Sequence, residues 1–135
     1  MEPLPAGWRE IANRVNDEVN ALESIPDQPG RDVWERAGEK GGDCEDMALE
    51  KLHRLMTEGF PIERLRLATC RVGWEDQQYQ MPHAVLVISA PDDHYVLDNR
   101  FPRVVPVYAL IVGGYSLEAI QKAGGSLEWI EWKHT

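Results

Sequence analysis

Residues 41–56 read GGDCEDMALEKLHRLM and join a glycine pair to an amphipathic segment. Apolar residues recur at the three- and four-residue spacing that places them on one helical face, at Met47, Ala48, Leu52, Leu55 and Met56. Asp43 is a natural N-cap, and Gly59 and Pro61 end the pattern. The stretch therefore predicts a helix that carries Cys44 in its first turn.

An earlier amphipathic helix is predicted over residues 8–22. Its apolar positions share one face and are Trp8, Ile11, Val15, Val19 and Leu22. Prolines and glycines then interrupt the helical pattern, so residues 26–42 are predicted to form a loop with a short turn around Trp34.

Strand signals follow the second helix. Residues 66–72 alternate between apolar and polar, and the run VLVI at 85–88 gives residues 83–89 the strongest strand signal in the chain. Residues 94–97 are predicted to pair with that strand through a hairpin turn at 91–93, PDD.

The C-terminal part is predicted from weaker patterns. Residues 104–112 are expected to be extended, residues 116–122 to form a short helix beginning at Ser116, and residues 127–132 to form a last strand. Two helices followed by mainly antiparallel strands predict an α+β fold. The length of 135 residues predicts a single domain over residues 1–135.

Charge and hydropathy narrow the class of protein. The formal net charge is -9, which disfavours nucleic-acid binding because phosphate recognition needs clustered Lys and Arg. The apolar stretches fall far short of the roughly 20 residues that a membrane-spanning helix needs. The N-terminus shows neither a basic region nor an apolar run, so a cytoplasmic protein is expected, and a periplasmic one only if a leader is removed.

Cys44 is the candidate nucleophile. A thiol attacks as the thiolate, and the free N–H groups and aligned peptide dipoles at a helix N-terminus favour negative charge there. The same N–H groups can donate to an oxyanion, and Gly41 and Gly42 leave room for a substrate. A capping or packing role is the alternative. Cys70 lies in an alternating apolar run, so both cysteines are expected as free thiols.

A nucleophilic cysteine also needs a base and a group that orients the base. His83 begins the strongest strand signal and Asp98 follows the predicted partner strand, so a hairpin would bring them to one sheet edge facing Cys44. The alternatives are that His83 caps a strand after Pro82 and that Asp98 ends a strand in a turn.

Four motifs in this order resemble the bacterial transglutaminase-like cysteine proteinases of the LapG type. They are GGDCEDMA at 41–48, LRL at 65–67, HAVL at 83–86 and VLDN at 96–99. The resemblance covers about residues 31–100 and implies a papain/transglutaminase-like fold, in which a helix bearing the nucleophile packs against a mainly antiparallel sheet. It also implies that Cys44, His83 and Asp98 are the catalytic positions.

The resemblance implies two further features. Members of the LapG type bind calcium through acidic residues beside the nucleophile, which here are Asp43 and Glu45; the alternative is that both residues only cap the helix and complement its dipole. Trp34, in the segment DVWE at 32–35, is expected to line the active site or its oxyanion pocket, with core packing as the alternative.

The expected function is hydrolysis of a peptide or amide bond in a protein or peptide substrate, through a thioester on Cys44. Acyl transfer to an amine and deamidation use the same intermediate and remain open, as does the oligomeric state. Two other classes are alternatives: a zinc site that uses Cys44, His83 and Asp98 as ligands, and a binding or structural module that keeps the fold without catalysis.

Overall fold

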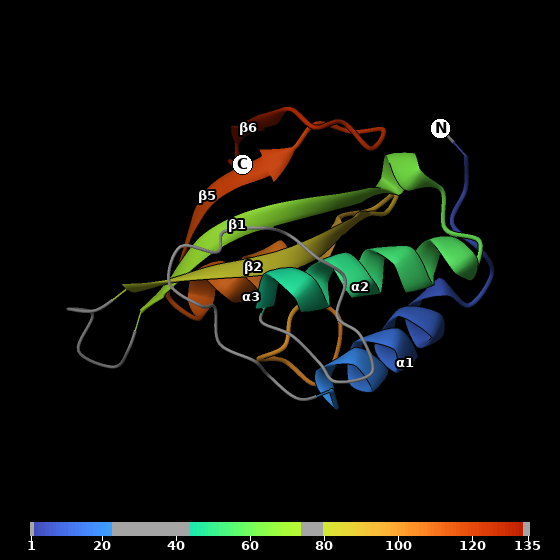
Figure 1. Ribbon diagram of the computed structural model, residues 1–135, viewed down its shortest axis with the longest axis horizontal. Coiled ribbons are helices and arrows are strands. Elements are labelled where there is room, and N and C mark those ends of the chain that lie inside the picture. The colour runs from blue at the N-terminus through green and yellow to red at the C-terminus, as the bar shows by residue number, and fades with distance from the viewer. Residues whose placement is uncertain (1, 23–43, 74–79, 134–135) are drawn as a thin grey trace.

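An antiparallel sheet and three α-helices make up the described part of the protein, a computed structural model that describes residues 2–22, 44–73 and 80–133 (Figure 1). Its elements in chain order are α1 (Trp8–Asn20), α2 (Cys44–Thr57), the short 3-10 helix η1 (Ile62–Arg64), β1 (Leu65–Gly73), β2 (Gln80–Ser89), β3 (His94–Leu97), β4 (Val105–Pro106), α3 (Val107–Val112), β5 (Tyr115–Gln121) and β6 (Trp129–Glu131). Within these residues the strands form one sheet in the order β4-β3-β2-β1-β5-β6, and neighbouring strands are antiparallel. The predicted α+β architecture is confirmed.

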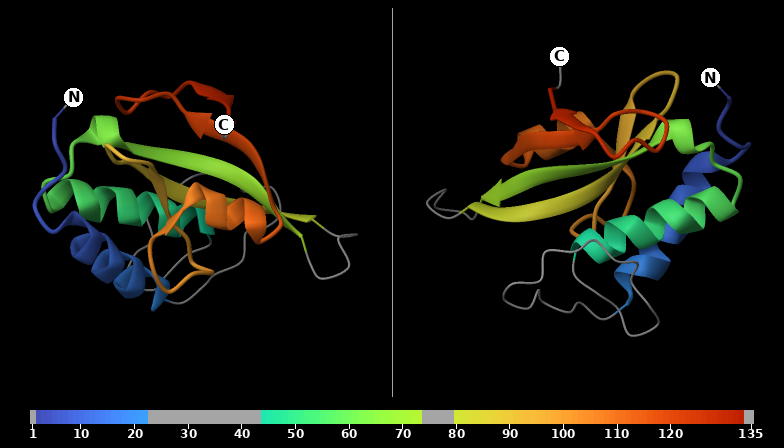
Figure 2. Two further views of the ribbon diagram at one scale, coloured as in Figure 1. Left: turned by 180° about the vertical axis from the view of Figure 1, so that it is seen from behind. Right: turned by 45° about the horizontal axis from the view of Figure 1, so that its top comes forward.

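The central strands of the sheet are buried on both faces, because helices cover them from opposite sides. Leu86 and Ile88 of β2 pack in one core with α1 and α2, whereas Val85 and Val87 pack in a second core with α3 and β5. This alternation follows from the two-residue period of a strand. Helix α2 lies toward the viewer in Figure 1, and α3 does so in the reverse view of Figure 2. Each fully buried aliphatic side chain contributes about 1.5–3 kcal/mol to folding.

The two long helices agree with their predictions. Helix α1 begins after Gly7, whose φ of 70° lies in the left-handed region that glycine adopts freely, and it buries Ala12, Val15 and Val19. Helix α2 begins at Cys44, as predicted, and buries Met47, Ala48, Leu52 and Leu55 toward the sheet. The amphipathic stripe in each sequence is the face that packs.

The central strands and their hairpin are also confirmed. Strand β1 covers the predicted segment 66–72, and β2 pairs with β3 through the turn at 91–93, where the Ala90 N–H donates to the Asp93 carbonyl at 2.9 Å. Strand β2 begins at Gln80, so His83 is its fourth residue rather than its first.

Two predictions for the C-terminal part are wrong. Residues 107–112 form helix α3 and not an extended segment, since Val107 and Leu110 lie three residues apart and are both buried in the second core. Residues 116–122 lie mostly in strand β5 and not in a helix, because backbone pairing with β1 overrides local helical preference. The predicted last strand exists and is shorter, as β6.

Among the described residues, no helix is both long and apolar enough to span a membrane. The predicted loop at 26–42, with its turn around Trp34, lies outside the described residues.

Candidate active site

Cys44 is the first residue of α2, and its side chain is half-buried. Glu45 and Asp46 follow it in the first helical turn. The N–H groups of this turn have no partner one turn earlier within the helix, so the N-terminus of α2 favours negative charge at the sulfur. The predicted position of the thiol at a helix start is therefore confirmed.

His83 and Asp98 form a buried pair beside this helix end. His83 lies on β2, and Asp98 follows directly after β3, so the β2–β3 hairpin brings them together. The His83 Nε2–H donates to Asp98 Oδ1 at 2.6 Å. His83 is 9% exposed and Asp98 is 0% exposed, so water does not compete for this bond.

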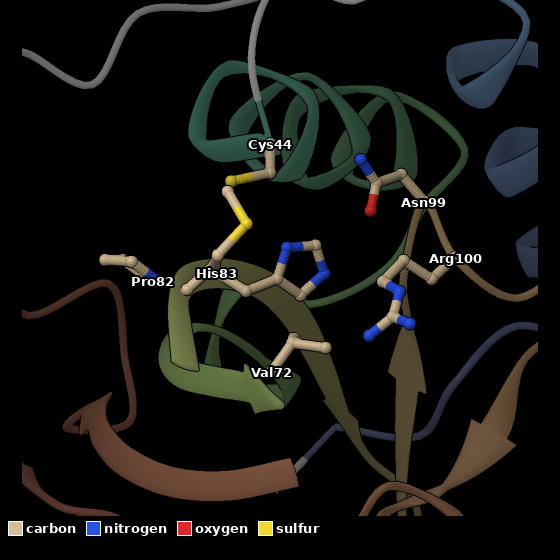
Figure 3. A pocket seen from close by; sticks show the side chains of 7 residues that line it. Cys44, Val72, Pro82, His83, Asn99 and Arg100 are labelled. Atoms are coloured by element: carbon tan, nitrogen blue, oxygen red, sulfur yellow. The ribbon is translucent and has the colours of Figure 1, made fainter. Parts of the chain in front are cut away.

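The other side of the His83 ring faces the thiol. Against the effect of burial, a hydrogen-bond contribution and the charge of Cys44 both raise the pKa of His83, so the thiol lies close to the imidazole. Since Asp98 occupies Nε2, Nδ1 is the nitrogen that faces Cys44. Figure 3 shows Cys44 at the start of α2 with the His83 ring next to it. The structure thus brings all three predicted residues together in the order thiol, imidazole, carboxylate.

Charge within this group favours a protonated imidazole. Burial acts most strongly and lowers the pKa of His83, but the hydrogen bonds to Asp98 and Cys44 and the charges of both groups outweigh it and raise that pKa from 6.5 to about 9. Burial raises the pKa of Asp98, yet the hydrogen bond and charge of His83 together with other donors hold it below its ordinary value. An imidazolium held by the Asp98 carboxylate is the partner that a thiolate nucleophile requires.

The main chain around Asp98 is held by helix α1. Asn20 Nδ2 donates to the Asp98 carbonyl at 3.2 Å, and Asn16 Nδ2 donates to the Phe101 carbonyl at 2.9 Å. Asn13 Oδ1 accepts from the Val104 N–H at 2.8 Å. The three asparagines are spaced by three and four residues and so share one helical face. They fix the segment 98–104 to the body of the protein.

A cleft of about 310 Å³ opens beside the thiol and the imidazole. Its lining residues are Cys44, Val72, Met81, Pro82, His83, Asn99 and Arg100. Asn99 and Arg100 lie on one side of the His83 ring and Pro82 on the other, so a polar and an apolar wall face each other across the site (Figure 3).

Two further ionisable groups lie beneath the site. Lys51, two turns after Cys44 on α2, is 1% exposed; burial lowers its pKa to about 8, while the charges of Asp98 and Cys44 oppose that shift. Cys70 on β1 is 0% exposed, and burial, assisted by the charges of Asp98 and Cys44, raises its pKa to about 12. Cys70 is therefore a packing residue, and both cysteines are free thiols as predicted.

The arrangement does not suit the zinc alternative. Asp98 binds Nε2 of His83 while Cys44 lies on the other side of the ring (Figure 3), so the three side chains do not converge on one point as a tetrahedral metal needs. Correspondingly, no group of three or more His, Cys, Asp or Glu in the described part of the chain is placed to hold a metal ion. Of the predicted calcium ligands, Glu45 lies in the first turn of α2, whereas Asp43 lies outside the described residues, as does Trp34.

Sequence reasoning missed the groups that surround Asp98. Tyr115 donates to its second oxygen at 2.6 Å, and the Arg100 N–H donates to the first at 3.0 Å. The asparagines of α1 could have been identified from the sequence, because asparagine is a poor helix former. Three of them on one helical face indicate hydrogen bonds to another part of the chain. Tyr115 could not be identified in this way, since its position depends on the pairing of β5 with β1.

A helix-borne thiol that faces a histidine–aspartate pair on an antiparallel sheet is the arrangement of the papain and transglutaminase class of cysteine hydrolases. The sequence matches the family described as bacterial transglutaminase-like cysteine proteinase over residues 4–135. The chain belongs to this family, and the predicted resemblance is confirmed.

Solved structures of LapG from Legionella pneumophila are similar to this fold. The calcium-bound structure has a TM-score of 0.67 and 25% identity, covering 84% of this chain and 65% of that chain, which is less than two thirds of its length. A second LapG structure has a TM-score of 0.68 and 25% identity over 90% of this chain and 70% of that one. The EGTA-treated structure has a TM-score of 0.66 and 24% identity, and the match covers 95% of this chain and 74% of that chain. No curated protein matches the chain significantly in sequence.

Proposed function

We propose that the protein is a cysteine peptidase that cleaves a peptide bond in a protein or peptide substrate, with Cys44 as nucleophile, His83 as general base and acid, and Asp98 as the group that orients His83. The observation that carries this proposal is the position of His83, which is hydrogen-bonded to Asp98 through Nε2 and turns its other side toward Cys44, at the wall of an open cleft (Figure 3). Membership of a cysteine proteinase family supports it.

In the first half of the reaction the Cys44 thiolate attacks the carbonyl carbon of the substrate, and an oxyanion forms. Backbone N–H groups in the first turn of α2 would donate to that oxygen. The His83 imidazolium then gives its proton to the leaving nitrogen as the carbon–nitrogen bond breaks. The products of this half are a free amine, a thioester on Cys44 and a neutral imidazole.

In the second half a water molecule attacks the thioester. His83 takes a proton from that water, and the carbon–sulfur bond breaks to release the carboxylic acid. The thiolate of Cys44 and the imidazolium of His83 are restored. Asp98 stays ionised throughout and holds the Nε2–H, which keeps Nδ1 directed at Cys44.

Alkylation tests the activated pair without a known substrate. At neutral pH iodoacetamide is expected to modify Cys44 at least about ten times faster than it does in the unfolded chain, because the helix N-terminus and His83 favour the thiolate. Cys70 should stay unmodified in the folded protein, since it is 0% exposed and its pKa is raised to about 12. Peptide mass mapping after timed labelling measures both sites.

The unfolded protein in denaturant serves as the control, because both thiols are then accessible and should react at similar rates. A folded Cys44 that reacts no faster than in denaturant would contradict the proposed nucleophile and favour the non-enzymatic alternative.

We also propose that calcium binds at the start of α2 through Glu45 and Asp43. LapG from Legionella pneumophila has been solved in a calcium-bound and an EGTA-treated form, and this chain shares its fold. The described ligand fits, because Glu45 is half-buried in the first turn beside Cys44 and carboxylate oxygens are the ligands that calcium prefers. A bound calcium would supply a fixed positive charge at the helix end.

Calcium at about 1 mM is expected to raise the melting temperature by on the order of 5–10 °C, because a ligand that binds only the folded state stabilises it. Glu45→Gln should remove most of that rise. Glu10→Gln is the matched control, since Glu10 is an exposed acid in the first turn of α1. Differential scanning calorimetry with calcium or EGTA gives the comparison, and an equal rise in wild type and Glu45→Gln would argue against this site.

A further inference from the structure

The Asp98 carboxylate is held by three donors from three parts of the chain. His83 Nε2–H donates to Oδ1 at 2.6 Å, and the Arg100 N–H donates to the same oxygen at 3.0 Å. The Tyr115 hydroxyl donates to Oδ2 at 2.6 Å. Since Asp98 is 0% exposed, Tyr115 is the group that satisfies its second oxygen.

We propose that Tyr115 is a fourth member of the active site, a positioning residue whose hydroxyl holds the Asp98 carboxylate in the orientation that accepts the His83 Nε2–H. Rotation of the carboxylate about its bond to Cβ moves both oxygens, so it would strain the bond to Tyr115 together with the bond to His83. The inference rests on the proposed function, because it assigns Tyr115 a role through Asp98 and His83.

The Tyr115 ring is itself fixed on several sides. It is 7% exposed and makes an edge contact with the His83 ring, with centroids 6.0 Å apart and planes at 78°. The Phe101 ring lies 6.2 Å away, and the Arg100 guanidinium carbon lies 5.4 Å from the Tyr115 centroid. A ring packed in this way cannot swing its hydroxyl away from Asp98, so the donor is preorganised.

The backbone explains why a residue so late in the chain reaches this site. Gly114, with a φ of 88°, turns the chain between α3 and β5 in a conformation that side chains rarely adopt. Tyr115 then begins β5 and lies opposite Val72 of β1. Val72 lines the cleft, so the start of β5 is adjacent to the reacting groups.

Electrostatics favour a permanent donor at this position. Burial and the hydrogen bond to Asp98 raise the pKa of Tyr115 well above its ordinary value, so the hydroxyl keeps its proton over the working pH range. The same hydrogen bond helps to lower the pKa of Asp98. The ionisable side chains that interact with Asp98 are Lys51 of α2, Cys70 of β1, His83 of β2 and Tyr115 of β5. Arg100 reaches it through the backbone N–H.

The test is the pH dependence of Cys44 alkylation in wild type and Tyr115→Phe. Without the hydroxyl, buried Asp98 is easier to protonate and supports the imidazolium less well. The acid limb of the rate profile is therefore expected to move up by about one pH unit, and the rate at neutral pH to fall about tenfold. A change in packing alone would lower the rate without moving the limb. Tyr108→Phe is the matched control, since Tyr108 is 63% exposed on α3, and it should leave the profile unchanged.

An acid limb that stays in place in Tyr115→Phe overturns this inference, whatever happens to the melting temperature. If Tyr115→Phe does not fold, the same measurement is made on protein that carries 3-fluorotyrosine at position 115. Its more acidic hydroxyl is a stronger donor, so the limb should move to lower pH, and an unmoved limb overturns the inference equally. A wild-type Cys44 that alkylates like an ordinary thiol contradicts the proposed function itself, which separates the two failures.

Discussion

Replacing Cys44 with alanine is expected to lower kcat/KM for peptide cleavage by about 10⁴-fold or more, because the thiolate forms the covalent intermediate. The fold should persist, since Cys44 is half-buried at the first position of α2 and the buried stripe of that helix lies further along. Digestion of a peptide library, with new termini identified by mass spectrometry, measures the loss and also reports the preferred cleavage sites.

Cys70→Ala is the matched control for this experiment. It removes the other thiol, which is buried on β1 and inert, so cleavage should continue while the melting temperature falls slightly. Cleavage that survives in Cys44→Ala and disappears in Cys70→Ala would reverse the assignment of the nucleophile.

Replacing His83 with glutamine is expected to lower kcat/KM by about 10³- to 10⁴-fold, because the variant can neither protonate the leaving amine nor activate water. It should also cost about 1–3 kcal/mol of stability near pH 6, since the partner of buried Asp98 is lost. The pKa of His83 is raised from 6.5 to about 9. Its contribution to stability is therefore complete below pH 6.5 and is lost as the pH rises through about 9.

The stability difference between wild type and His83→Gln should accordingly be larger at pH 6 than at pH 10. Urea unfolding at both pH values measures it. His94→Gln is a suitable control, because His94 lies at the start of β3, away from the cleft residues. A difference that grows toward pH 10 would mean that His83 is neutral in the folded protein, and the thiolate–imidazolium pair would have to be abandoned.

The parts of the fold that the sequence predicts well are those in which local pattern and burial agree. Helices α1 and α2 carry apolar stripes that become their packed faces, and the β2–β3 hairpin has a dense β-branched strand and a clear turn. For α3 and β5 the two disagree. Val107–Val112 is rich in β-branched residues and yet helical, and β5 is a strand because β1 offers it an edge. In both segments contacts with distant parts of the chain override the local preference, and a pattern of neighbouring residues does not reveal such contacts.

The active site likewise contains residues that local patterns predict and residues that only distant contacts bring into place. Cys44, His83 and Asp98 were identified from a helix start, a strand and the end of a hairpin, and the structure brings them together. Tyr115 and the asparagines of α1 were missed, because they reach Asp98 from elements distant in sequence. Asp43 and Trp34 lie outside the described residues, so their roles remain predictions.

The pairing of β1 with β5 has a consequence for how the protein is made. Ala68 pairs with Ile120 across these strands, so the middle of the sheet is completed only after β5 has been synthesised. Contacts between such distant residues slow folding, because the entropy of closing the intervening loop is lost before they form. A nascent chain on the ribosome thus carries the thiol of Cys44 well before it carries the hydroxyl of Tyr115. The reactive centre is therefore assembled only when nearly all of its strands have emerged, and unfinished chains lack it.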